Sequence, residues 1–195
     1  MDGKEFFEQF QNEINKRDET GQRKYWDCYS DNKTFTDVIN RNIIPGIIKN
    51  ANLIPEQEYY RIDVIGYRKE EIKKMEDTKL NFYRWDLEIA VEHENNDADW
   101  LNELVKLLHV RCPLKVIISY NRYDNRDEGG QSDLNKLKCA AECMKATRCF
   151  AKSEDSSEEY LIILGNCGGK DHYASFDYRG YLYNYEEGSF EPIKD

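Results

Sequence analysis

Residues 82–96, FYRWDLEIAVEHENN, contain the pattern that decides the fold. Apolar and acidic side chains alternate along this stretch, and side chains two positions apart lie on the same face of a β-strand. The stretch therefore predicts a strand with one buried face and one face that carries a row of carboxylates. The apolar parity comprises Trp85, Leu87, Ile89, Val91 and His93, and the other comprises Asp86, Glu88, Ala90, Glu92 and Glu94.

The acidic row has more than one interpretation. Carboxylates at this spacing repel one another unless a positive charge lies among them. A metal ion, a Lys or Arg from a neighbouring element, and solvent alone are the three alternatives. A half-buried surface strand gives the same alternation with its acids simply solvated.

The rest of the chain predicts helices and strands on both sides of this strand. Apolar periodicity predicts helices over 4–19, 37–50, 100–112 and 134–150, with Thr36 capping the second. It predicts strands over 58–68, 114–120 and 159–166, and a hairpin over 173–185 that turns at Arg179-Gly180. The segments 69–79 and 121–133 are predicted loops, and the tail 186–195 is predicted to fray. This order predicts an α/β (α+β) fold, a single domain over 1–195 with a mixed central sheet flanked by helices.

The composition of the chain narrows the classes of function that it can have. The chain has 195 residues, is 39% hydrophobic and carries a net charge of −10, which argues against a protein that coats nucleic acid nonspecifically but leaves a local basic groove open. The first residues form no apolar signal region, and no run is long enough to cross a membrane. We therefore expect a cytoplasmic protein without a membrane partner, whose six Cys are free thiols.

Two further groups are expected to be structural. Cys139, Cys143 and Cys149 lie on one predicted helix without the second close Cys pair that zinc sites usually have, so we expect thiols that face the core. His93 is expected to be a packed, hydrogen-bonded histidine.

Acidic residues of two predicted strands can form a site. Asp63 lies in the strand over 58–68, and Glu92 and Glu94 lie in what we expect to be its neighbour. Neighbouring strands are ~4.8 Å apart, so these carboxylates can converge on one hard cation such as Mg²⁺. Such sites also need a positive side chain near the reacting atoms, for which Lys106 and Arg61 are the local candidates.

These residues resemble a known family. Asp63 within RIDVIGY (61–67), followed by Glu92-His93-Glu94 late in the next strand, looks like the metal-binding motif of the PD-(D/E)xK nuclease superfamily, the restriction-endonuclease-like fold. The resemblance covers about residues 34–120, and segments within 131–187 would complete the sheet. It implies Asp63 and Glu92 as ligands of Mg²⁺ or Mn²⁺ and nucleic acid as the partner, DNA before RNA. A homodimer and a protein partner stay open.

The chain departs from the family pattern at two positions. Glu94 stands where most members have Lys, and Ile62 stands where the motif has Pro. The resemblance allows Lys106 to act as a migrated catalytic Lys, so the predicted catalytic set is Asp63, Glu92, Glu94 and Lys106. The acid that the family sometimes recruits from its first helix would be Asp37 or Glu13.

The basic candidates for nucleic-acid binding are spread along the chain, and a solvated helix face gives the same pattern for most of them. They are Arg61, Lys136, Lys138, Lys145 and Arg148.

Three functions remain open on the sequence. The first is a Mg²⁺-dependent nuclease that uses Asp63 and Glu92 with Glu94. The second is a catalytically inactive, nuclease-like binding or regulatory module, and the third is an acidic protein that binds a basic protein partner.

Overall fold

The computed structural model describes residues 1–25, 27–28, 31–72, 82–95, 99–122, 126–151, 157–167 and 178–194. Seven strands form one mixed sheet whose spatial order follows the chain, from β1 to β7. β1, β2 and β3 form an antiparallel meander, β3, β4 and β5 run parallel, and β6 and β7 are antiparallel again. The strands are β1 (Ile54–Tyr59), β2 (Ile62–Ile72), β3 (Phe82–Glu94), β4 (Leu114–Arg122), β5 (Glu159–Cys167), β6 (Arg179–Asn184) and β7 (Ser189–Pro192).

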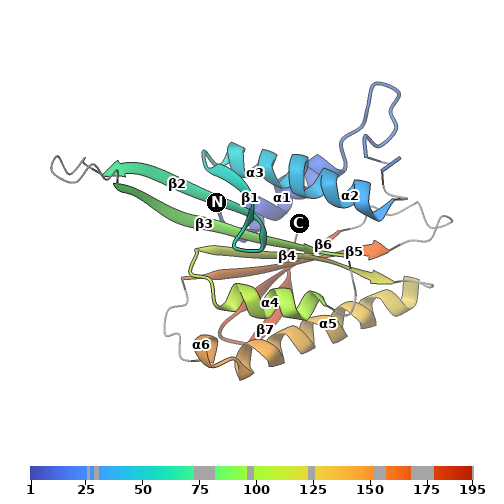
Figure 1. The fold of residues 1–195 in the computed structure, drawn as a ribbon. Coiled ribbons are helices and arrows are strands. Elements are labelled where there is room, and N and C mark those ends of the chain that lie inside the picture. The colour runs from blue at the N-terminus through green and yellow to red at the C-terminus, as the bar shows by residue number, and fades with distance from the viewer. Residues whose placement is uncertain are drawn as a thin grey trace.

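Helices cover both faces of this sheet, which confirms the predicted mixed sheet flanked by helices (Figure 1). One layer holds α1 (Gly3–Ile14), α2 (Asn32–Val38), the π-helical turn η1 (Ile39–Ile43) and α3 (Ile44–Asn50). The opposite layer holds α4 (Trp100–Leu108), α5 (Arg126–Ala146) and α6 (Arg148–Ala151). No described helix is long and apolar enough to span a bilayer.

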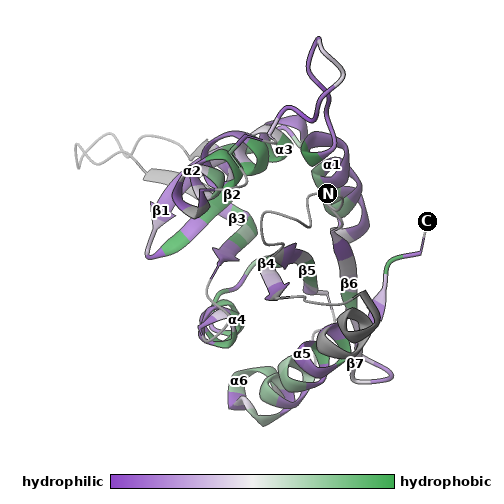
Figure 2. Ribbon diagram, turned by 90° about the vertical axis from the view of Figure 1, so that its right-hand side faces the viewer, coloured by the Kyte–Doolittle hydropathy of each residue, from purple (hydrophilic) through white to green (hydrophobic). Residues whose placement is uncertain are grey.

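Each helical layer buries its own apolar cluster against the sheet, and the helices turn their hydrophobic sides inward (Figure 2). Phe6, Phe10 and Ile14 of α1 pack against strand residues such as Val91 and Ile163. On the other face, the Trp100, Leu104 and Leu107 stripe of α4 packs near Ala90 and Ile117.

The predicted alternation of β3 is correct only for its last part. Ile89 and Val91 belong to the cluster under α1–α3, and Ala90 belongs to the cluster under α4–α6. Leu87 was expected to share the face of Ile89, but it packs against the cluster under α4–α6. The reason is a β-bulge: Gly66 pairs with Ile89 and Tyr67 with Leu87, so one extra residue of β3 reverses the parity.

The region around 58–68 is a hairpin rather than one strand. β1 ends at Tyr59, β2 begins at Ile62, and Tyr59 pairs with Ile62. Tyr60 and Arg61 alone make the turn, with φ of 48° and 65°. Asn and Gly usually fill such a two-residue loop with positive φ, so the sequence carried no turn signal here.

Other boundaries also differ from expectation. Asp31, not Thr36, caps α2. α5 begins within the predicted loop 121–133. Arg179-Gly180 lies inside β6, and the predicted frayed tail supplies β7. The predicted loop 69–79 begins as strand, since β2 continues to Ile72, and residues 73–81 lie outside the described residues.

Candidate functional site

The meander places Asp63 and Glu92 beside each other at one end of β2 and β3. Val64 pairs with Val91, and the next residues along this antiparallel ladder are Asp63 and Glu92. The backbone N–H of His93 donates to Oδ2 of Asp63 at 2.8 Å, which fixes that carboxylate against β3. Glu92 is only 2% exposed. Both acids share the face of Ala90 and therefore point toward α4.

α4 brings Lys106 into contact with this pair. Nζ of Lys106 lies 2.7 Å from Oε1 of Glu92 and also contacts the carboxylate of Glu103, one turn earlier on α4. The same ammonium donates to the backbone carbonyl of Arg61 at 2.7 Å. Lys106 therefore links α4, the end of β3 and the β1–β2 turn.

Carboxylates outnumber the positive charge at this point. Burial raises the pKa of Glu92 to about 8 against the opposing hydrogen bond and charge of Lys106, and the charge of Asp63 acts in the same direction as burial. Burial also raises the pKa of Asp63, against the His93 N–H and Lys106, with contributions from Glu103 and Glu94 in the same direction as burial. The free energy cost of holding these groups ionised is therefore high unless further positive charge enters the site.

Lys106 stays protonated in this environment. Burial is the largest single effect and would lower its pKa, but the hydrogen bonds to Glu103 and Glu92 and the charges of these two carboxylates together raise it. The pKa values of Glu92 and Lys106 can both be raised, because Glu103 gives the ammonium of Lys106 a second carboxylate partner besides Glu92. Lys106 is thus the resident cation of the cluster formed by Asp63, Glu92, Glu94, Glu103 and Lys106, which we call the carboxylate cluster.

Of the four basic residues predicted along 136–148, only Lys136 lies at the same edge of the sheet as the carboxylate cluster. Glu94 pairs with Ser119 of β4. Nζ of Lys136 donates to the carbonyl of Tyr120 at 2.7 Å and lies 3.4 Å from Oγ of Ser119. Its ammonium also lies over the ring of Trp100, the first residue of α4, 5.2 Å from the centroid. Lys136 is therefore one strand away from Glu94.

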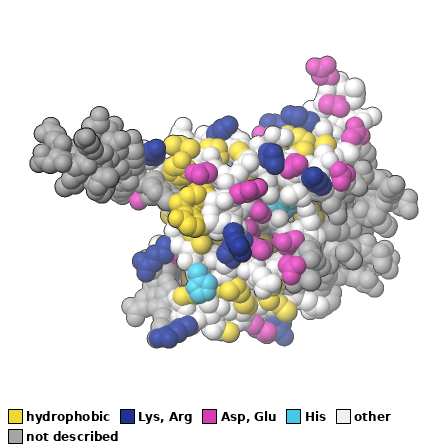
Figure 3. Space-filling model, in the orientation of Figure 1, with side chains coloured by type: hydrophobic (Ala, Val, Ile, Leu, Met, Phe, Trp, Pro, Cys, Tyr) yellow, Lys and Arg dark blue, Asp and Glu magenta, His cyan; other side chains and the backbone are white. Residues whose placement is uncertain are grey.

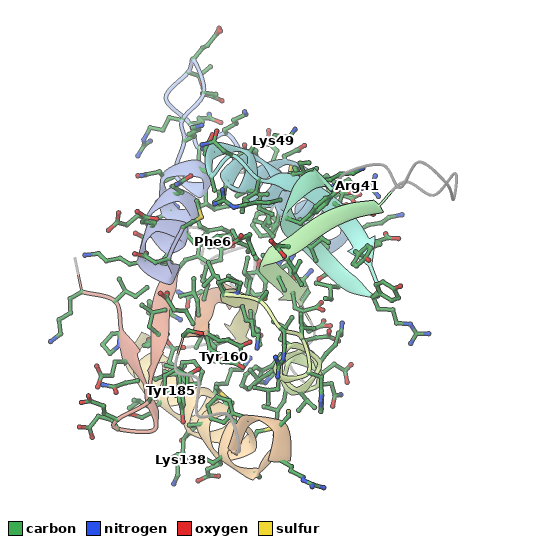
Figure 4. The ribbon with its side chains drawn as sticks, turned by 90° about the vertical axis from the view of Figure 1, so that its left-hand side faces the viewer. Phe6, Arg41, Lys49, Lys138, Tyr160 and Tyr185 are labelled. Carbon is green, nitrogen blue, oxygen red and sulfur yellow. The ribbon has the colours of Figure 1, made fainter. Side chains whose placement is uncertain are left out.

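The other predicted basic contacts are placed elsewhere. Lys138, on α5 in the layer of α4–α6, is exposed and points away from the sheet (Figure 4). Lys145 lies against Gly188 in the β6–β7 turn, and Arg148 is exposed on α6. Arg61 is exposed and reaches the cluster through its carbonyl. These four side chains therefore make no joint basic groove with Glu92.

The first-helix acids are not recruited to the cluster. Asp37 pairs with Arg41 at 3.0 Å, and Glu13 pairs with Lys16 at 2.5 Å.

His93 lies behind the cluster, on the opposite face of β3, and is packed and hydrogen-bonded as predicted. Its Nδ1 lies 3.2 Å from Oδ1 of Asn40 in η1, and its Nε2 lies 2.7 Å from the hydroxyl of Tyr120. Burial lowers the pKa of His93 to about 3, so the ring is neutral. Because the neighbouring N–H of the same residue holds Asp63, this buried network fixes the position of a site carboxylate. The sequence held no signal for Asn40 or Tyr120.

The cysteines are free where described, as predicted, but their placement differs from expectation. Cys139 and Cys149 are exposed and Cys143 is half-buried, whereas all three were expected to face the core. α5 turns Leu137, Ala140, Ala141 and Met144 inward instead. The helical spacing of these four apolar residues thus decided which face is buried.

The carboxylate cluster offers oxygen donors to a metal ion, but few of them lie close together. Among residues with described positions, no three His, Cys, Asp or Glu side chains group closely enough to hold one. Two carboxylates with raised pKa on neighbouring strands still provide the hard oxygen donors that Mg²⁺ takes, since it commonly uses one or two carboxylates and keeps waters. The donor chemistry therefore fits, provided that Lys106 gives up its contact with Glu92.

The face that carries the site is acidic at its centre. Figure 3 shows Asp and Glu side chains gathered in the middle of this face, with Lys and Arg side chains beside them and an apolar patch next to them.

Comparisons with protein-family models, with curated proteins and with solved structures each found no match.

Proposed function

We propose that this protein is a Mg²⁺- or Mn²⁺-dependent nuclease that hydrolyses phosphodiester bonds of nucleic acid. The observation that carries the proposal is the pair Asp63 and Glu92, two largely buried carboxylates on adjacent strands whose pKa values are raised. Perturbed carboxylates of this kind gather at functional sites, because a site built for a cation or a proton holds charge that the apo protein poorly neutralises.

The order of elements supports the same proposal. α3 precedes the antiparallel meander β1–β3, α4 follows it, and β4 runs parallel to β3. This helix–meander–helix–strand order is what the resemblance to the PD-(D/E)xK superfamily implies. We therefore propose a restriction-endonuclease-like core over about residues 34–120.

Each residue of the cluster has a role in the proposal. Asp63 and Glu92 would hold the metal, which when bound supplies an activated water and neutralises charge on the phosphate. The N–H of His93 orients Asp63. Lys106, held by Glu103 and the Arg61 carbonyl, stands within reach of the charge that develops on the phosphate, in place of the Lys that Glu94 replaces. Lys136, one strand away from Glu94, is a candidate for contact with a flanking phosphate.

Calorimetry with Mg²⁺ and Mn²⁺ tests the proposal on the parent protein, Asp63→Ala and Glu92→Ala, with a nuclease assay on the same samples. We expect metal binding in the parent, loss of that binding in both variants, and metal-dependent cleavage of DNA or RNA that disappears with it. Glu88→Gln is the matched control, since Glu88 also lies on β3 but pairs with Arg68 at 3.1 Å, away from Lys106. This variant should bind and cut like the parent.

One observation favours a second candidate, the catalytically inactive binding or regulatory module. Lys106 already neutralises part of the charge of Glu92, as a structural ion pair would. A parent protein that binds no metal at millimolar concentration and cuts nothing would support this candidate. The acidic face of Figure 3 would then be tested for binding to a basic protein partner.

A further inference from the structure

The β1–β2 turn holds a large aromatic side chain in solvent at the rim of the carboxylate cluster. Tyr60 is 82% exposed, the highest value among the large hydrophobic residues described as exposed. Its ring lies edge-on to Tyr59, with the centroids 4.6 Å apart, and Tyr59 packs against the cluster under α4–α6. The next residue, Arg61, gives its carbonyl to Lys106. Tyr60 is therefore supported on the same side of the sheet as the carboxylate cluster.

The backbone of this turn is unfavourable for the residues that occupy it. Glu58, Tyr60 and Arg61 have φ of 54°, 48° and 65°. Such conformations are strained for non-glycine residues, and they concentrate where a site constrains the chain. The turn nevertheless carries Tyr and Arg, two side chains that stack on bases and contact phosphates.

The charge of the site limits how it can hold a nucleic acid. The protein has a net charge of −10, and Lys136 is the single predicted helix cation beside the carboxylate cluster. Binding therefore gains little from phosphate contacts and counterion release, which supply most of the affinity of basic proteins. Stacking of a base on an aromatic ring supplies affinity without such contacts.

We propose that Tyr60 stacks on an unpaired base of the substrate and that Arg61 contacts the adjoining phosphate, so that the site takes single-stranded or unpaired nucleic acid. This inference rests on the proposed function and narrows its substrate class. An unpaired base is required because a base inside a duplex has both faces covered by its neighbours. A ring at the tip of a two-residue turn meets one exposed face of a base without entering a groove.

The test measures binding of short oligonucleotides that carry 2-aminopurine, whose fluorescence falls on stacking, in Ca²⁺ instead of Mg²⁺. Single-stranded and blunt duplex forms of one sequence are compared on the parent, Tyr60→Ala and Tyr60→Phe. We expect the parent to prefer the single strand, Tyr60→Ala to weaken that binding about 5- to 150-fold, and Tyr60→Phe to retain it within about twofold. Quenching of 2-aminopurine should disappear in Tyr60→Ala alone.

Ile54→Ala is the matched control. Ile54 is also exposed, by 44%, and lies on β1, but at the end away from the turn. Its variant should bind like the parent. The exposure of Tyr60 means that its removal should leave the fold intact, which thermal unfolding of the same samples checks.

The outcomes separate this inference from the proposed function. If the parent binds the single strand and Tyr60→Ala binds equally well, or if the parent prefers the duplex, the stacking inference is overturned while the nuclease proposal stands. If the parent binds neither form and cuts neither form, both are overturned.

Discussion

Glu92 carries a carboxyl group in the site whose burial opposes its negative charge. Its carboxyl is 2% exposed, and burial raises its pKa to about 8 from an ordinary value near 4.5. Between these pH values the folded protein keeps a proton that the unfolded chain releases. The contribution of Glu92 to stability is therefore complete below about pH 4.5 and is lost as the pH rises toward 8.

Glu92→Gln should remove this pH dependence. Urea unfolding of the metal-free parent and variant at several pH values between about 5 and 8 measures the difference in unfolding free energy. We expect the variant to gain stability relative to the parent as the pH rises, by at most about 1.4 kcal/mol per pH unit, the value for one proton. Glu88→Gln should show no such trend. A difference between Glu92→Gln and parent that stays constant over this range would contradict the assigned shift.

At the scale of elements, the β1–β2 turn is the least favourable piece of backbone near the site. Arg61→Gly keeps the carbonyl that Lys106 binds and removes the cost of a positive φ on a residue with a Cβ. We expect a gain of about 1–2 kcal/mol in unfolding free energy by urea denaturation.

Glu88→Gly is a comparison in which no positive φ is relieved, and it should destabilise β3 by roughly 0.5–1 kcal/mol. A loss of stability in Arg61→Gly would mean that the Arg61 side chain stabilises the turn more than its backbone strain opposes it. The proposed phosphate contact would then need a test by Arg61→Ala instead.

Periodicity in the sequence predicted some elements near the site and missed others. The start of α4 at Trp100 and its apolar stripe were predicted because both are local features, but the helix ends at Leu108, four residues before the predicted end. The turn at Tyr60-Arg61 was missed because neither residue prefers a positive φ, and Arg179-Gly180 was mistaken for a turn. Gly180 is a glycine for another reason: a Cβ there would lie 2.7 Å from the ring of Phe7 on α1. The turn between β6 and β7 contains Gly188, with φ of 62°.

At the scale of the whole molecule, the first helix packs against the last half of the chain. Phe10 of α1 is fully buried and lies edge-on to Tyr178, with ring centroids 5.0 Å apart. Phe10→Ala should cost about 3–5 kcal/mol of unfolding free energy, because it removes buried surface and leaves a cavity. Phe10→Leu fills most of that space and should cost less.

This variant also tests the predicted single domain. Trp100 lies on the opposite face of the sheet from Phe10, and it alone supplies the Trp fluorescence once Trp26 and Trp85 are replaced by Phe in every sample. If the chain is one cooperative unit, far-UV circular dichroism and Trp fluorescence should shift together to the same lower urea midpoint in Phe10→Ala. A fluorescence transition that keeps the parent midpoint while the dichroism shifts would show that the two faces unfold separately, and the single-domain prediction would be wrong.

The sequence by itself determined the mixed sheet, the interior strands, α4 and the face shared by Asp63, Glu92 and Glu94, because periodic burial is written in local spacing. It could not show the bulge that reverses Leu87, nor the Asn40 and Tyr120 partners of His93. Nor could it show that Lys106 contacts Glu92 and the Arg61 carbonyl, or that Tyr60 stands exposed at the rim of the carboxylate cluster. Only the tertiary structure decided these features, because each depends on contacts between residues distant in the chain, whose partners local propensity does not encode.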